Sequence, residues 1–256
     1  MMDESDWIII PARHDSSRLP GKPLAEIAGR PMIHWVYERG VAAGSEHVVV
    51  ATDDERIQEA AAEIGARAVL TSEGHASGTD RLAEVIDFLE LPDETVVVNL
   101  QGDEPMMPPV LLAQVAKLLR AKPEAAMATL MVPIADREEF LSPDAVKVVA
   151  NERAEAMYFS RAPIPFHRDG LPEAGEAGIF GFRHLGLYAY RAGFLRRFVA
   201  TGSPEIERLE KLEQLRALSM GETIAIEIAE VTPPPGVDTE ADLERVRRLM
   251  AEEMAD

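Results

Sequence analysis

A short segment near the N-terminus combines three basic residues with three prolines. The run Ile8–Pro11 is apolar enough for a buried strand, and the loop that follows it contains Arg13, Arg18 and Lys22. The prolines restrict the backbone, so that the cations are held in fixed directions. Because guanidinium and ammonium groups bind phosphate oxygens well, this loop predicts a receptor for a polyanion such as a triphosphate. The alternative is a surface loop with scattered basic residues.

A second polar segment follows another apolar run. The predicted strand Thr95–Leu100 is followed by Gln101 and, two residues later, by Asp103. Ligands of an open parallel sheet bind beyond the carboxyl ends of its strands, where Arg13 and Asp103 would both fall. Magnesium prefers oxygen ligands and keeps several waters, so one or two carboxylates with phosphate oxygens can hold it. We therefore assign Asp103 as a magnesium ligand; the alternative is that it caps the turn before Pro105.

The segment Ser77-Gly78-Thr79-Asp80-Arg81 allows two interpretations. Ser77 or Thr79 can cap the helix that follows, which alone would explain the hydroxyls. Arg81 lies in the first helical turn, where the helix dipole favours anions over cations. Because of this misfit, a nucleotide-facing role for Arg81 and a purely structural role are about equally supported by the sequence.

The segment Gly236–Leu243 is equally ambiguous. Asp238 or Thr239 is a natural N-cap for the last helix, with Asp242 able to complete a capping box. On the local residues alone, capping is favoured over metal binding at Asp238.

Composition narrows the classes of function. The chain has 256 residues, 46% of them hydrophobic, and a net charge of −19 from 26 basic and 45 acidic residues. This balance argues against nucleic-acid or anionic-membrane binding, and an anionic ligand needs a local cationic pocket. The absence of cysteine excludes disulfides, thiol nucleophiles and thiolate zinc sites. No apolar run approaches the ~20 residues that span a bilayer, so we expect no membrane insertion and a cytoplasmic protein.

The first half of the chain alternates strands and helices. Strands are predicted over Trp7–Pro11, His47–Thr52, Arg67–Leu70, Thr95–Leu100 and Ala126–Val132, and helices over Pro31–Ala43, Asp54–Ile64, Thr79–Leu89 and Pro109–Arg120. This alternation predicts an α/β fold with a mostly parallel sheet and helices on both faces.

The second half is more mixed. Strands are predicted over Ala145–Ala150, Glu155–Ser160, His184–Tyr190 and Thr223–Ala229, helices over Ala192–Val199, Lys211–Met220 and Glu240–Met254, and a long mobile loop over Arg161–Gly181.

Seven motifs together resemble one enzyme family. In chain order they are PARHDSSRLPGKP, SGTDRLAEV, NLQGDEP, YFSRAPIPF, HLGLYAYR, LEKLEQLRAL and GVDTEADLERVR. The set, which runs from Ile8 to Leu249, resembles the CMP-Kdo synthetases, the 3-deoxy-manno-octulosonate (Kdo) cytidylyltransferases. The first motif also occurs in looser form in other sugar nucleotidyltransferases, whereas the ordered set is specific to this family.

The resemblance implies a nucleotidyltransferase sheet, Rossmann-like and GT-A-like, with a smaller mixed α/β subregion. It implies a homodimer that uses Mg²⁺ and converts CTP and Kdo to CMP-Kdo and pyrophosphate for lipopolysaccharide biosynthesis. Within a single domain, residues 1–256, it suggests a nucleotide-binding half over 7–133, a sugar-binding and dimerisation subregion over 134–230, and a returning segment over 231–256.

The resemblance also assigns roles to individual residues. Arg13, Arg18 and Lys22 would bind the triphosphate, and the catalytic residues would be Lys22, Arg18 and Asp103. The nucleotide site would be lined by Ala12, Ser77 and Arg81, Gln101 would lie between nucleotide and sugar, and magnesium would be held by Asp103 and Asp238. The sugar acid would be bound by Arg161, His184, Tyr188, Glu213 and Gln214. For Asp238 this reverses the local preference for capping. Without the resemblance, Glu213 and Gln214 read as a solvated helix face, and His184 and Tyr188 as part of a half-buried strand.

The chain departs from the family pattern at Asp80, where a glutamate is common, and residues 167–182 receive no assigned contacts. His14, His34, His47, His75 and His167 show no metal-ligand spacing and are interpreted as structural or exposed. Three other functions remain open: activation of a sialic acid or 8-amino-Kdo, a glycosyltransferase, and a non-catalytic sensor of sugar nucleotides. Release of pyrophosphate from CTP with each candidate sugar distinguishes all of them.

Overall fold

The computed structural model of the protein describes residues 2–15, 18–75, 77–171 and 178–253. Within these ranges nine strands form one sheet: β1 (Trp7–Ala12), β4 (His47–Thr52), β5 (Arg67–Leu70), β6 (Val96–Asn99), β7 (Met127–Ile134), β8 (Lys147–Ala150), β9 (Ala156–Ser160), β10 (Gly181–Arg191) and β11 (Ile224–Ile228). A separate hairpin consists of β2 (Glu26–Ile27) and β3 (Arg30–Pro31).

The helices follow the strands in chain order. They are α1 (Met32–Ala42), α2 (Glu55–Glu63), α3 (Gly78–Phe88), α4 (Pro109–Ala121), α5 (Arg137–Leu141), α6 (Ala192–Ala200), α7 (Glu205–Glu210), α8 (Gln214–Ser219) and α9 (Glu240–Glu253), with a 3₁₀ turn η1 (Lys22–Leu24).

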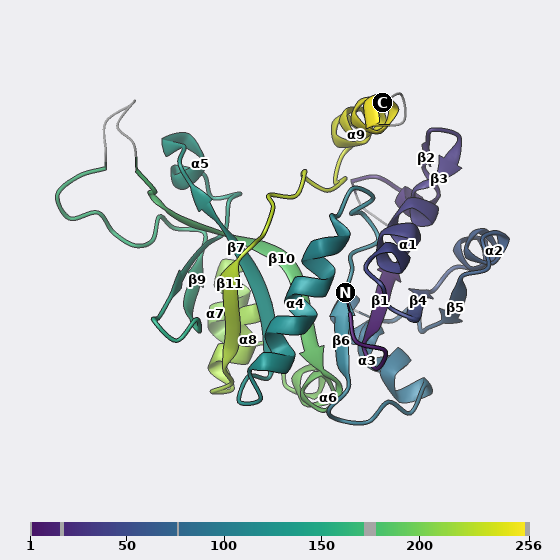
Figure 1. Ribbon diagram of the computed structural model, residues 1–256, viewed down its shortest axis with the longest axis horizontal. Helices are drawn as coiled ribbons and strands as arrows, with labels where there is room; N and C mark the ends of the chain where they lie inside the picture. The colour runs from purple at the N-terminus through teal and green to yellow at the C-terminus, as the bar shows by residue number, and fades with distance from the viewer. Residues whose placement is uncertain (1, 16–17, 76, 172–177, 254–256) are drawn as a thin grey trace.

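The main sheet has the strand order β11-β7-β10-β6-β1-β4-β5. The pairs β6–β1, β1–β4, β4–β5 and β7–β11 are parallel, whereas β10 runs antiparallel to both β6 and β7. The β8–β9 pair joins the sheet through β10 and projects to the left in Figure 1. The mostly parallel α/β sheet is confirmed.

Two apolar cores cover the faces of the sheet. One contains buried residues of α1, α2, α4 and α9, and the other contains those of α3, α6 and α8. Parallel strands buried on both faces need continuous apolar runs, and Ile8, Ile9 and Ile10 of β1 are all fully buried. The sheet therefore holds the carboxyl ends of β1 and β6 rigidly side by side.

The segment after β11 returns across the molecule. In Figure 1 it crosses from β11, on the left, to α9, beside the β2–β3 hairpin. Arg247 Nε of α9 donates to the carbonyl of Glu26, and Leu243, Val246 and Met250 pack into the core. A residue in the 231–239 connection can therefore meet the loop after β1.

Two predictions for the second half need correction. The single helix predicted over Lys211–Met220 is wrong, because Lys211 adopts a left-handed conformation (φ 56°) that ends α7, and α8 begins only at Gln214. The strand predicted from His184 begins earlier, at Gly181. Residues 172–177 of the predicted loop lie outside the described residues. None of the helices in the described ranges combines the length and the apolar character that a bilayer crossing requires.

Candidate functional site

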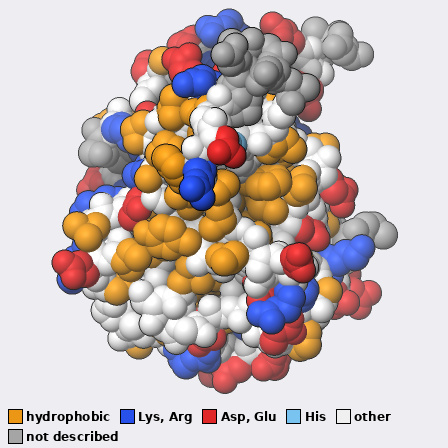
Figure 2. Space-filling model, turned by 90° about the vertical axis from the view of Figure 1, so that its left-hand side faces the viewer, with side chains coloured by type: hydrophobic (Ala, Val, Ile, Leu, Met, Phe, Trp, Pro, Cys, Tyr) orange, Lys and Arg blue, Asp and Glu red, His pale blue; other side chains and the backbone are white. Residues whose placement is uncertain are grey.

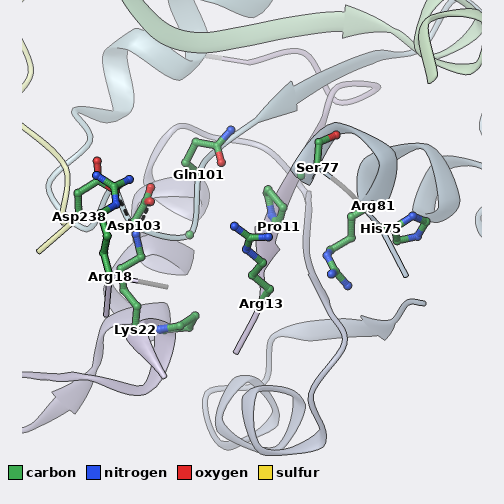
Figure 3. A pocket seen from close by; sticks show the side chains of 13 residues that line it. Pro11, Arg13, Arg18, Lys22, His75, Ser77, Arg81, Gln101, Asp103 and Asp238 are labelled. Atoms are coloured by element: carbon green, nitrogen blue, oxygen red, sulfur yellow. Dashed lines mark hydrogen bonds and ion pairs between the residues drawn. The ribbon is translucent and has the colours of Figure 1, made fainter. Parts of the chain in front are cut away.

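The segments with the strongest predictions meet at one cavity of about 230 Å³. It lies at the carboxyl ends of β1 and β6, and Figure 3 shows the side chains around it. Eight residues predicted to bind nucleotide or metal line it: Arg13, Arg18, Lys22, Ser77, Arg81, Gln101, Asp103 and Asp238. In Figure 3, Asp103 and Asp238 lie on one side, Ser77 and Arg81 on the other, with Gln101 between them.

Gly102 allows the loops after β1 and β6 to approach each other. A Cβ at this position would lie 2.7 Å from the carbonyl oxygen of Pro11, closer than such atoms approach. Side chains larger than hydrogen would therefore push the two loops apart. The close approach brings Gln101 and Asp103 alongside Arg13.

Lys22 is surrounded by oxygen atoms from two distant parts of the chain. Its Nζ lies 2.7 Å from Asp103 Oδ2, 2.8 Å from the carbonyl oxygen of Val237 and 3.5 Å from Asp238 Oδ1. Arg18 Nη2 donates to the same Asp238 oxygen at 2.9 Å. The structure thus joins the N-terminal loop, the β6 loop and the returning segment around one position that holds a cation.

The local preference for Asp238 as a helix cap is wrong. Thr239 caps α9 instead, because its Oγ1 accepts from the backbone N–H of Asp242, whose carboxylate accepts from Thr239 N. This is the predicted capping box, and it leaves the Asp238 carboxylate free to face Lys22. Asp103 likewise directs a carboxylate oxygen at Lys22, so it does more than stabilise a turn.

Gly236 fits the returning segment against the β6 loop. A Cβ at residue 236 would lie 2.9 Å from Glu104 Oε1 and 3.1 Å from the carbonyl oxygen of Asp103. Val237 N donates to that same carbonyl at 2.9 Å. Burial, together with the carboxylates of Asp103 and Asp238, raises the pKa of Glu104 to about 8. The shift favours the neutral form of Glu104 at pH 7, which limits the negative charge beside Asp103 and Asp238.

This set of oxygen atoms suits magnesium. The two carboxylates and the Val237 carbonyl already converge on a cation, the Lys22 ammonium, and hard oxygen donors are the ligands that Mg²⁺ takes. Among the described residues no three His, Asp or Glu side chains converge to hold a metal alone. A magnesium ion at Asp103 and Asp238 would thus depend on phosphate oxygens and water for its remaining ligands.

The basic residues of the cavity differ in how strongly they are engaged. Arg13 has neither a hydrogen bond nor an ion pair with any described residue and is exposed to the cavity. Arg18 and Lys22 are paired with carboxylates. Arg81 is 3% exposed, with its guanidinium bonded to Asp53 Oδ2 at 2.6 Å and to the Thr71 hydroxyl. Arg81 therefore contacts the cavity while it ties the ends of β4 and β5 together.

Three other residues near the nucleotide side of the cavity differ in whether they line it. Ser77 caps α3 in a reciprocal box with Asp80, which retains this function despite being shorter than glutamate. Ala12 packs its side chain in the core, and only its neighbours in sequence line the cavity. His75, interpreted from sequence as structural or exposed, lines the cavity and bonds Glu84 through Nε2.

Most of the predicted sugar residues lie outside the 230 Å³ cavity. Glu213 lines a neighbouring groove, which also contains Ser77, and its Oε2 accepts from Thr79 Oγ1 at 2.7 Å. His184 and Tyr188 lie on β10 with their rings 5.3 Å apart. Burial lowers the pKa of His184 to about 3 and raises that of Tyr188 well above its usual value, so both are neutral. Gln214, the first residue of α8, is buried.

Arg161 lies at the end of β9 and is held by main-chain oxygens. Its Nε donates to the carbonyl of Glu210 at 2.8 Å, and its Nη1 donates to that of Pro143 at 2.9 Å. The Glu210 carboxylate accepts from Arg161 N at 2.9 Å, which fixes the backbone as well. The guanidinium is thus oriented without being neutralised by a side-chain carboxylate of the described residues.

Sequence reasoning missed the residues that support the predicted ones. Lys147 is fully buried and donates to the carbonyls of Ser142, Ala145 and Arg161 at 2.5–2.7 Å. Thr79, predicted from the sequence only as a helix cap, donates a hydrogen bond to Glu213. The pattern of the chain carries no signal for Lys147 beyond a lysine within an apolar run, because its acceptors are carbonyl groups of the folded backbone.

Comparison with known proteins agrees with this geometry. Residues 7–224 match the cytidylyltransferase family. A 3-deoxy-manno-octulosonate cytidylyltransferase from Hahella chejuensis is 55% identical over 248 residues, 95% of this chain and 97% of the relative. The corresponding enzyme from Halorhodospira halophila is 53% identical over 246 residues, 95% and 96% of the two chains.

A solved structure is similar over the whole chain as well. It is that of CMP:2-keto-3-deoxy-manno-octonic acid synthetase complexed with CTP, and it is 45% identical. The match has a TM-score of 0.88 and covers 97% of this chain and 99% of that one. Fold, motif order and identity agree, and the chain therefore belongs to the cytidylyltransferase family, among the 3-deoxy-manno-octulosonate cytidylyltransferases.

Proposed function

We propose that this protein transfers the cytidylyl group of CTP to Kdo, releasing pyrophosphate and forming CMP-Kdo for lipopolysaccharide biosynthesis. The observation that carries this proposal is the convergence of Asp103, Asp238 and the Val237 carbonyl on Lys22, beside Arg13, which pairs with none of the described residues. In a chain of net charge −19, this cavity concentrates cations where a triphosphate needs them. The relatives named above carry the same activity in their names.

In the proposed reaction the anomeric hydroxyl oxygen of Kdo forms a bond to the α-phosphorus of CTP. The bond from that phosphorus to the oxygen bridging to the β-phosphate breaks, pyrophosphate leaves, and the hydroxyl proton passes to solvent. Arg13, Arg18 and Lys22 bind the triphosphate and stabilise negative charge on the departing pyrophosphate. Ser77, Arg81 and Gln101 line the nucleotide side of the cavity, and Ala12 supports it from the core beneath. Holding two anions in one orientation is itself a large contribution.

We propose Mg²⁺ as the cofactor, held by Asp103 and Asp238. When bound, it would lower the pKa of the sugar hydroxyl and offset phosphate charge. The carboxylates also orient Lys22, whose ammonium pairs with both of them.

The sugar acid is proposed to bind across Gln101, Arg161, His184, Tyr188, Glu213 and Gln214. A carboxylate suits the oriented guanidinium of Arg161, and hydroxyl groups suit the neutral imidazole, phenol and amide groups. Buried polar groups of this kind discriminate strongly against a sugar that leaves them unpaired.

We also propose a homodimer formed by the left-hand side of the molecule in Figure 1. Figure 2 shows apolar side chains gathered on that side. Large exposed apolar residues of its elements include Leu141, Met157, Phe166, Ile179 and Leu209. An apolar face of this kind marks an interaction surface. We place the enzyme in the cytoplasm, where CTP is available.

A pyrophosphate-release assay that crosses CTP and UTP with Kdo, 8-amino-Kdo and a sialic acid, with and without Mg²⁺, tests the proposal. The expected result is release with CTP, Kdo and Mg²⁺ together, and a kcat/KM for Kdo above that for the other sugars. Preference for another sugar acid would reassign the substrate. CTP binding without any release would instead favour a sensor, and cleavage of a sugar nucleotide would favour a glycosyltransferase.

A further inference from the structure

A buried threonine contacts the predicted sugar-site histidine. Thr129, in the middle of β7, is 0% exposed, and its Oγ1 lies 2.9 Å from His184 Nε2. The same oxygen lies 3.0 Å from the carbonyl oxygen of Leu185 and 2.8 Å from that of Leu187. One hydroxyl therefore faces three groups at hydrogen-bonding distance.

A bulge in β10 creates this arrangement. The antiparallel register pairs Leu185 with Leu130 and then Tyr188 with Thr129, so Gly186 and Leu187 have no partner on β7. The two extra residues turn carbonyl groups of β10 toward the Thr129 side chain. A valine at position 129 would fill similar space but could not bond to them.

The number of protons on these groups determines which form of imidazole is present. A hydroxyl has one hydrogen to donate, and the two carbonyl oxygens can only accept. The Thr129 hydrogen therefore points to a carbonyl, and His184 Nε2 faces the hydroxyl oxygen as the donor. A neutral imidazole carries a single N–H, so Nδ1 is left as an acceptor. The strongly lowered pKa of His184 is consistent with a neutral ring.

Nδ1 of His184 has no hydrogen-bond partner among the described residues. The ring itself is fixed, since Phe159 contacts it edge-on with centroids 4.9 Å apart and Tyr188 packs against it at 5.3 Å. His184 is 8% exposed, so part of it remains accessible to a ligand.

We propose that His184 meets the sugar acid only as a hydrogen-bond acceptor, through Nδ1, and that Thr129 is the positioning residue that imposes this tautomer. The inference rests on the proposed function, because it assigns a direction to one contact of the proposed sugar site. An acceptor at this position selects a sugar that presents a hydroxyl there and rejects one in which hydrogen or fluorine replaces that hydroxyl.

The tautomer can be measured on the unmodified protein. Long-range ¹H–¹⁵N correlation of protein labelled with ¹⁵N-histidine distinguishes Nε2–H from Nδ1–H rings, and the His184→Asn variant identifies which of the six histidine patterns is lost. We expect an Nε2–H pattern for His184 with and without Kdo. An Nδ1–H pattern, or a mixture of the two forms, would overturn the proposal.

Two isosteric substitutions test the direction of the bond to the sugar. In His184→Asn the amide oxygen takes the place of Nδ1, whereas in His184→Gln the amide nitrogen takes the place of Nε2. We expect the KM for Kdo to rise about tenfold more in His184→Gln than in His184→Asn, with the KM for CTP unchanged in both. The reverse order would show that the sugar meets a donor.

Thr129 is tested by a matched pair. Thr129→Val should raise the KM for Kdo about five- to tenfold and convert the NMR pattern of His184 to a mixture, while Thr129→Ser should behave like the wild type. If Thr129→Val retains the His184 tautomer and changes kcat or the KM for CTP as much as the KM for Kdo, Thr129 has a structural role only. If Kdo supports no pyrophosphate release in the wild type, the proposed function fails. The NMR experiment tests the tautomer of His184 independently of that outcome.

Discussion

At the scale of single residues, Lys22 is the cation that balances the two carboxylates of the cavity. Its ammonium is the centre on which Asp103, Asp238 and the Val237 carbonyl converge, and its side chain is 12% exposed. A cation in that position keeps two carboxylates together in a protein that already carries a large negative charge. The same carboxylates then oppose the phosphates of CTP unless cations balance them.

Replacing Asp103 by Asn separates the role of this carboxylate in holding magnesium from the role of the basic residues in binding CTP. The amide keeps the shape of the side chain but removes one charge from the proposed magnesium site, while Arg13, Arg18 and Lys22 remain for the triphosphate. We expect kcat to fall about 100-fold or more, with the fold intact and CTP affinity within about threefold of the wild type. Pyrophosphate release, calorimetric CTP binding and the melting temperature measure the three quantities. Near-normal kcat at saturating Mg²⁺ would exclude Asp103 as a metal ligand.

The buried ring of His184 gives the stability a predictable pH dependence. Because burial lowers its pKa from 6.5 to about 3, the unfolded chain binds a proton in this range that the folded protein does not. The stabilisation is complete above pH 6.5 and is lost as the pH falls toward 3, by about 1.4 kcal/mol per unit. Between about pH 6.5 and 5, the free energy of unfolding should therefore fall by about 1.6 kcal/mol more in the wild type than in His184→Asn. Urea titrations at both pH values measure this, and equal losses would indicate a ring that ionises freely.

At the scale of elements, β8 and β9 position Arg161 through Lys147. The Lys147 ammonium bonds the carbonyl of Arg161 and two carbonyls of the turn before β8, and that turn provides the Pro143 oxygen that accepts from the guanidinium. Burial, together with the nearby Arg161 guanidinium, lowers the pKa of Lys147, so the charge is held there at a cost that these bonds offset.

Lys147→Met keeps the length of the side chain and leaves three carbonyls, one of them buried, without this donor. We expect the free energy of unfolding to fall by about 2–4 kcal/mol and the KM for Kdo to rise while the KM for CTP stays constant. Denaturant unfolding and steady-state kinetics provide the two readouts. Lys117→Met, on the exposed face of α4, is the matched control and should change neither. Equal increases in both KM values for Lys147→Met would mean that Lys147 does not act through Arg161.

The returning segment depends on Gly236 in a similar way. Alanine there must move away from Glu104 Oε1 and the Asp103 carbonyl, and such a shift would displace Asp238 from Lys22. Gly236→Ala should therefore raise the Mg²⁺ concentration needed for half-maximal rate by about tenfold or more. Gly202→Ala, where a Cβ would meet no atom within 4 Å, is the control. If Gly236→Ala and Gly202→Ala show the same magnesium dependence, close packing at Gly236 does not position the metal site.

The elements also show what the sequence could predict. The sequence predicts the parallel strands within one or two residues because each is rich in apolar residues, and it predicts β4 and β5 with the observed bounds. The β2–β3 hairpin was missed because its strands have two residues each, and the break at Lys211 was missed because lysine gives no turn signal. Asp238 was placed with Asp103 only through the resemblance, since local residues favoured capping. The contact of Thr129 with His184 depends on a bulge that no local pattern encodes.

At the scale of the whole molecule, the proposed dimer explains one feature that a monomer does not. Phe166 is 85% exposed and Met157 62% exposed. Met157 lies on β9 and Phe166 in the connection from β9 to β10, segments on the left of Figure 1, and Figure 2 shows that side as rich in apolar groups. Strand β9 pairs only with β8 among the described strands and is thus an edge of the sheet. Natural proteins cover or charge such edges, and a second copy of the chain would cover this one.

Charges placed on this face should therefore separate the subunits. We expect the Met157→Glu, Phe166→Glu double variant to elute as a monomer of about 28.1 kDa and the wild type at twice that mass, as measured by size-exclusion chromatography with light scattering. Each new carboxylate would be buried without a partner in the dimer, which is strongly unfavourable. Phe88→Glu, which changes a phenylalanine that is 66% exposed on α3, is the control and should leave the mass unchanged. A wild-type protein that is monomeric at all concentrations would contradict the proposal, as would a double variant that retains the wild-type mass while Phe88→Glu loses it.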